Sequence, residues 1–201
     1  MKSWRLVVLV TAAPVALAVA GLIHPHFLTR ETARSWQQLH VYLLPIFPLL
    51  ALGFIVPLWR RPERSLAGVA TVVAWVGAFT YAVFYTGLDL VAGYAAGTVA
   101  RNGAFTDFGA AIQPLFAGGD AFGRIGVYGF LLASAAMTVA LLTRYGVRAA
   151  PAGIILIAAG WSFRDSHIFW PRGVLTMLAI GIGFALTVRL VSSRSKLPPD
   201  A

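Results

Sequence analysis

The stretch 65–88, SLAGVATVVAWVGAFTYAVFYTGL, runs for 24 residues without a charged side chain. An α-helix of this length rises about 36 Å, which is enough to cross the roughly 30 Å hydrocarbon core of a bilayer. Its apolar residues are continuous rather than alternating with polar ones, which argues against a strand of a transmembrane barrel. Five further uncharged stretches behave in the same way: 6–23, 41–59, 125–143, 149–163 and 173–188. We therefore predict an all-α, polytopic integral membrane helix bundle.

The composition supports this fold class. The 201 residues are 59% hydrophobic and 11% charged, and the mean hydropathy is +0.78. An ordinary soluble domain carries roughly 25% charged residues, and one of this size has no interior large enough for so much apolar surface. The same composition argues against a disordered chain. There are no cysteines, which excludes disulfides, thiolate metal ligands and a cysteine nucleophile.

If each of these stretches is extended by a few flanking residues, the chain forms about six transmembrane helices in a single transmembrane domain, 1–201. They are expected at about 5–23, 37–59, 66–88, 124–143, 149–168 and 173–191, with an outer loop at 98–123 and a flexible tail at 192–201. Two alternatives stay open. The first helix also has the shape of a cleavable signal peptide, because basic residues precede an apolar run that ends Ala18-Val19-Ala20-Gly21. The segment 149–188 also fits a re-entrant pair.

Lysine and arginine are divided unevenly between the two sides that alternating helices define. The side with both termini holds ten basic and two acidic residues, whereas the opposite side holds six basic and five acidic ones. The positive-inside rule therefore places both termini in the cytoplasm of a multi-pass protein of the cell membrane. The net charge of +9 is explained by this bias, so we expect the lipid bilayer and not nucleic acid as the partner.

Two segments have special features. Pro45, Pro48 and Pro57 remove amide hydrogens from the helix expected at 37–59, which should be bent or partly unwound. The outer loop 98–123 is too apolar for a free loop, and we expect it to lie on the membrane surface or fold back over the bundle. Another interpretation is that this loop docks a membrane protein partner.

All four histidines fall near the outer ends of predicted helices. Imidazole is the commonest protein ligand of metals, and without thiolates a site here offers nitrogen and oxygen only, which suits zinc or copper. The candidate metal ligands are His24, His26, His40 and His167. The alternative is that each ring lies at headgroup level and bonds water, lipid or backbone. A haem held between two of them is disfavoured, because the positions are peripheral.

Three charged residues extend this site. Asp89 lies within an apolar run at the outer boundary. Arg164 and Asp165 lie close to His167 in the sequence. Ionisable groups this close to hydrocarbon are costly and are often functional. We expect Asp89, Arg164 and Asp165 to bind ligand in one outward-facing pocket with the histidines. The alternative for each is a cap or turn whose charge reaches water.

The predicted function is an outward-facing His/Asp pocket that binds a transition metal or a small polar ligand. Two alternatives remain: a membrane-embedded enzyme that uses the same His/Asp set, or a structural or assembly subunit of a membrane complex. The sequence has no G-x-S-x-G and no P-loop. It does not specify the ligand or the oligomeric state.

Overall fold

A computed structural model describes residues 3–59, 62–104 and 106–194 of the chain, and within these residues every regular element is helical. The predicted all-α class is therefore confirmed. The first half contains α1 (Ser3–Ile23), α2 (Ala33–Leu43), η1 (Phe47–Ala51), α3 (Leu52–Ile55), α4 (Leu66–Leu88) and the π-helical η2 (Asp89–Ala95). The second half contains α5 (Ala96–Asn102), α6 (Phe108–Tyr145), η3 (Gly146–Ala149), α7 (Ala150–Ser166) and α8 (Arg172–Arg194).

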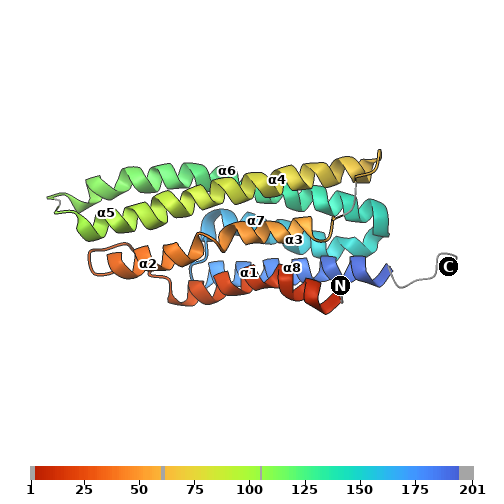
Figure 1. Cartoon of the computed structure of the whole chain (residues 1–201), viewed down its shortest axis with the longest axis horizontal. Helices are drawn as coiled ribbons and strands as arrows, with labels where there is room; N and C mark the ends of the chain where they lie inside the picture. Colours follow the sequence, from red (N-terminus) through yellow and green to blue (C-terminus); the bar gives the residue numbers. More distant parts are fainter. Residues whose placement is uncertain (1–2, 60–61, 105, 195–201) are drawn as a thin grey trace.

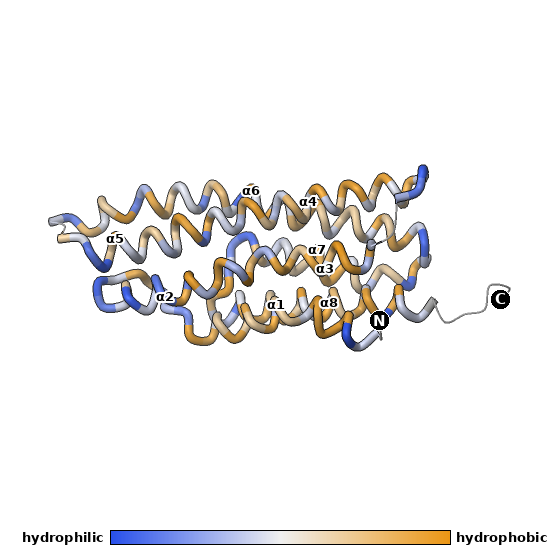
Figure 2. Tube along the Cα trace, in the orientation of Figure 1, coloured by the Kyte–Doolittle hydropathy of each residue, from blue (hydrophilic) through white to orange (hydrophobic). Residues whose placement is uncertain are grey.

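Five helical runs are long and apolar enough to cross a membrane. They are Ser3–Ile23, Ala33–Ile55, Leu66–Asn102, Phe108–Ser166 and Arg172–Ser193. The fourth run joins α6 to α7 through η3, and α7 doubles back along α6 (Figure 1). Figure 2 shows hydrophobic residues along the helices and hydrophilic ones at the bends. The six-helix count and the cytoplasmic termini stay predictions. Part of the predicted tail, 195–201, and Lys2, Arg60 and Arg61 lie outside the described residues.

The segment expected as an outer loop, 98–123, is mostly helical, so that assignment was wrong. α4, η2 and α5 form one run of 37 residues, and α6 has 38 residues, so each is about 55 Å long. The 21 residues of α1 reach only about 32 Å. The segment 89–123, which we call the 89–123 hairpin, therefore projects beyond the ends of α1 and α7 (Figure 1).

Two local features explain why the 89–123 hairpin is helical. The carboxylate of Asp107 accepts a hydrogen bond from the Ala110 backbone N–H (2.9 Å) and caps the start of α6. The apolar residues of this segment, which do not suit an exposed loop, pack against α2. Together they form a second small core around Ala33, Ala96, Ala100 and Ile112. Arg101 lies in the last turn of α5, and Asp107 caps the start of α6.

The helix expected at 37–59 is interrupted, as its prolines predicted. α2 ends at Leu43, and the chain continues as the short helices η1 and α3. The hydroxyl of the buried Tyr81 donates a hydrogen bond to the Phe47 carbonyl at this break (3.1 Å). A side chain of α4 therefore bonds a backbone carbonyl at the interruption, away from water.

Small residues bring α4 and α6 together. Gly77 of α4 faces Gly129 of α6, and a Cβ added at Gly129 would lie 2.7 Å from the Tyr81 backbone nitrogen and 2.8 Å from the Gly77 carbonyl oxygen. Ala70, Ala74 and Ala78 of α4, spaced four residues apart, are also buried. This close contact fixes the position of α4, which carries Asp89 at its end.

We predict that Gly129→Ala destabilises the protein by about 1–3 kcal/mol, because two backbones must separate to admit the methyl group. The matched control is Gly118→Ala in the same helix, where the new Cβ would meet only a Val91 methyl group at 3.7 Å. That control should be neutral or slightly stabilising, since alanine favours helix over glycine. Thermal unfolding of the two purified variants in detergent measures the difference. Equal unfolding midpoints would contradict the close α4–α6 contact.

Candidate metal centre

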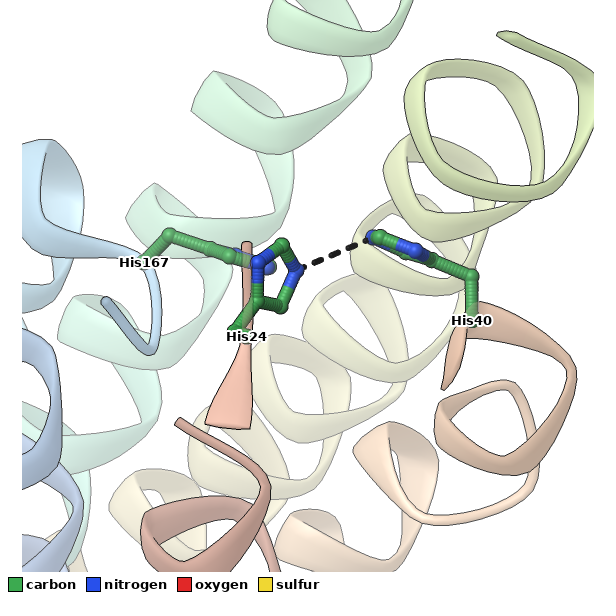
Figure 3. Close-up of side chains that lie close together, drawn as sticks. All are labelled: His24, His40 and His167. Carbon is green, nitrogen blue, oxygen red and sulfur yellow. Dashed lines mark hydrogen bonds between the residues drawn. The ribbon is translucent and has the colours of Figure 1, made fainter. Parts of the chain in front are cut away.

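Three of the four histidines meet where α1 and α7 end beside α2. His24 directly follows α1, His40 lies on α2, and His167 caps the end of α7. One ring nitrogen from each lies within 4.8 Å of the others, and the three rings turn toward a common point (Figure 3). His24 and His40 are only 5% and 2% exposed, and His167 is partly buried.

The backbone around the cluster is shaped to bring these rings together. Gly21, one turn before His24, lies so close to the Ile168 carbonyl that a Cβ would overlap it, so α1 packs directly on the link after α7. His167 has φ 45°, and among the described residues no other non-glycine residue has positive φ. Such strained backbone occurs preferentially at functional sites, where surrounding contacts maintain it.

Hydrogen bonds fix which nitrogen of His24 and His40 carries the proton. Nδ1 of His24 lies 2.7 Å from the Pro25 carbonyl oxygen, and Nδ1 of His40 lies 2.7 Å from the Trp36 carbonyl oxygen. A carbonyl oxygen only accepts, so both Nδ1 atoms are donors. In a neutral imidazole the other nitrogen, Nε2, then has a free lone pair.

The two Nε2 atoms of His24 and His40 lie 3.4 Å apart. Two lone pairs at this distance repel unless a cation lies beside both. A proton is disfavoured, because burial and the nearby His40 lower the pKa of His24 to about 4. Burial, together with His24 and His40, also lowers the pKa of His167 well below its usual value. Neutral rings at pH 7 are the form that binds a metal ion.

The 3.4 Å between Nε2 of His24 and Nε2 of His40 suits a tetrahedral zinc ion. Zinc–nitrogen bonds of about 2.0–2.1 Å place two ligand nitrogens about 3.3–3.4 Å apart at tetrahedral angles. His167 adds a third ring, and its Nδ1 lies 2.7 Å from the hydroxyl oxygen of Tyr85. All three Nδ1 atoms thus contact an oxygen, which is the usual way that metal-binding histidines are oriented. If His167 binds through Nε2, its Nδ1–H donates to Tyr85.

Asp89 supplies a negative charge beside the cluster. Its side chain is fully buried, and neither carboxylate oxygen has a hydrogen-bond partner among the described residues. Oδ1 lies 3.8 Å from Nε2 of His40, which is too far for a hydrogen bond. Burying a carboxylate without a partner is costly, so this position favours a cation nearby or a proton on the carboxyl group. Asp89 also begins η2, and π-helical segments are frequent at functional sites.

η2 also holds His40 in place. A Cβ at Gly93 would overlap the His40 ring, so only glycine leaves room for it. The His40 ring also stacks on the Trp36 ring, with ring centroids 5.0 Å apart and an interplanar angle of 28°. The Trp36 indole N–H donates to the Ala92 carbonyl (3.2 Å), which ties α2 to η2.

A cavity of about 410 Å³ reaches the cluster from the side of α6 and α7. His40, His167 and Tyr85 form part of its wall. Aromatic rings of Phe116, Phe163 and Phe169 line it as well, and so do the exposed side chains of Arg124, Arg164 and Asp165. A small molecule in this cavity would therefore contact two of the three candidate ligands.

The structure brings four of the predicted site residues together, places two on the wall of the adjoining cavity and leaves one outside. His24, His40, His167 and Asp89 come together, as described above. Arg164 and Asp165 form an exposed ion pair (3.3 Å) on the cavity wall, and Arg164 also lies over the Trp161 ring. His26 is exposed and stacks on Phe169 at 6.1 Å, outside the three-histidine group.

The sequence analysis missed Trp36, Tyr85 and Gly93. Helical spacing contained a signal for two of them, because Trp36 precedes His40 by four residues and Tyr85 precedes Asp89 by four. Residues at this spacing lie on one face of a helix. Gly93 had no such signal, since its role depends on the approach of α2 to η2.

Comparisons of the chain with protein-family models, curated proteins and solved structures found no match. The chemistry of the cluster therefore has to follow from its own geometry. That geometry consists of three histidines that could hold a metal, next to a buried carboxylate, in a chain whose helices are compatible with a multi-pass membrane protein.

Proposed function

We propose that this chain is an integral membrane protein that binds one transition metal ion through His24, His40 and His167. The observation that carries the proposal is the pair of Nε2 lone pairs of His24 and His40, which face each other at 3.4 Å in a buried site. The unpartnered carboxylate of Asp89 supports it, because a divalent cation at the cluster would offset this buried charge.

Zinc is the ion that this donor set favours most. Three imidazoles are a donor set typical of zinc sites, the 3.4 Å between Nε2 of His24 and Nε2 of His40 matches tetrahedral zinc, and copper(II) is the second candidate. A haem between His24 and His40 is disfavoured, because 3.4 Å between their Nε2 atoms leaves no place for the macrocycle. Because Arg164 and Asp165 pair with each other, we assign them to the cavity wall and not to the metal.

We further propose that the cavity faces the outer side of the membrane. The beginning of α1 and the end of α8 lie at one end of the bundle, away from the cluster (Figure 1). The excess of lysine and arginine on the side of the termini supports a cytoplasmic location for that end. The metal would then lie where α1, after about 32 Å of helix, has crossed the hydrocarbon.

We predict that the protein purified in detergent with zinc retains one zinc per chain after gel filtration, and that His167→Ala or His24→Ala reduces this to a small fraction. The control is His26→Ala, which removes an exposed imidazole outside the cluster and should retain one zinc. Elemental analysis against protein concentration measures the ratio. Equal zinc in the His26→Ala and His167→Ala variants would contradict the proposed site.

We predict that Gly93→Ala also loses zinc, although it removes no ligand, because the new methyl group displaces the His40 ring. Gly118→Ala, at a position of α6 where a Cβ makes only an ordinary contact with Val91, is the control and should bind zinc normally. Zinc affinity is measured by competition with a chelator of known affinity, and unfolding curves establish that both variants are folded. A folded Gly93→Ala variant with wild-type affinity would show that His40 is not a ligand.

A further inference from the structure

We infer that the metal centre is hydrolytic: it keeps one coordination position open to the cavity, and Asp89 serves as general base toward a water molecule bound there. The expected substrate is a small acyl compound, an ester or amide. This inference rests on the proposed metal site and adds to it a reaction and the role of a fourth residue.

The number and position of the histidines support an open position. Structural zinc sites use four protein ligands, whereas catalytic sites use three and leave the fourth position to water or substrate. The cluster brings together three histidines, and two of them also form part of the cavity wall. The fourth position of a tetrahedral ion therefore has a place to open into.

Asp89 is placed to act on a water molecule rather than on the metal. Its Oδ1 lies 3.8 Å from Nε2 of His40, and Asp89 is not in the group of residues whose ligand atoms all lie within 4.8 Å of one another. Both of its oxygens are free of other hydrogen bonds among the described residues, so they are available to accept from a metal-bound water. A buried carboxylate beside such a water is the usual general base of metal hydrolases.

The cavity suits a small acyl compound. Its volume of about 410 Å³ lies within the usual range for small-molecule sites, and Phe116, Phe163 and Phe169 offer apolar contact to an acyl chain. Acyl hydrolysis needs one metal, whereas two-metal sites are the common arrangement for phosphoryl transfer. The negative charge of Asp89 would also oppose a phosphate dianion at this position.

Water is the only co-reactant. A metal held by the three histidines would activate this water as a Lewis acid. Asp89 would accept a proton from the water while the water oxygen forms a bond to the acyl carbon, and the carbonyl π electron pair would move to the carbonyl oxygen. When that pair returns, the bond to the leaving oxygen or nitrogen breaks. The leaving group takes the proton from Asp89, so the products are a carboxylic acid and an alcohol or amine.

Two measurements on the full-length protein test this inference. Acetohydroxamate is titrated into the cobalt(II)-loaded protein, and its visible spectrum should change because the ligand enters the open position. The zinc-loaded protein is assayed with p-nitrophenyl esters from acetate to octanoate. Asp89→Asn should still bind one zinc at saturation and release p-nitrophenol at least 100-fold more slowly. His26→Ala, which lies outside the cluster, should match the wild type.

The contrary results distinguish a failure of the hydrolytic inference from a failure of the proposed metal site. A cobalt spectrum that acetohydroxamate leaves unchanged would show a closed site. Loss of zinc at saturation in a folded Asp89→Asn variant would make Asp89 a ligand. Absence of zinc-dependent hydrolysis across the ester series would remove the hydrolytic role. These three outcomes overturn the inference and leave the metal site standing, whereas a wild-type protein that binds no metal overturns the proposed function itself.

Discussion

The two imidazoles of His24 and His40, whose Nδ1 atoms bond backbone carbonyls, are the constraint on which the site depends. Because these bonds direct both Nε2 lone pairs at each other across 3.4 Å, the pair is favourable only with a cation beside it. Asp89 also favours a cation nearby, since its buried carboxylate has no hydrogen bond within the described part of the chain. One metal ion would satisfy both groups at once.

The fold creates this place by combining helices of unequal length. α1 and α7 end at the cluster, while the runs that begin with α4 and α6 continue into the 89–123 hairpin. Trp36 of α2 and Gly93 of the hairpin pack against His40 there, and His24 and His40 are both buried. The close glycine contact of α4 with α6 and the space left by Gly93 place Asp89 and His40 within reach of each other.

Much of the fold followed from the sequence, because uncharged stretches in lipid have to be helices. The proline breaks after α2 were predictable too. The 89–123 hairpin was not, since its apolar residues suit a segment on the membrane surface as well as helices packed against α2. Three histidines and Asp89 were predicted from their depth at the ends of helices. Depth alone did not separate His26 from His24, because the two residues flank Pro25 and only the fold determines that His24 is buried and His26 exposed.

X-ray absorption at the zinc edge of the purified, zinc-loaded protein tests the central claim most directly. It reports the type and distance of the atoms bound to the metal without any assumption about substrate. A tetrahedral site with three imidazole nitrogens at about 2.0–2.1 Å is the predicted result, and these imidazole signals should be lost in a folded His167→Ala variant. A six-coordinate spectrum of oxygen ligands alone, or no retained zinc in the wild type, would contradict the account.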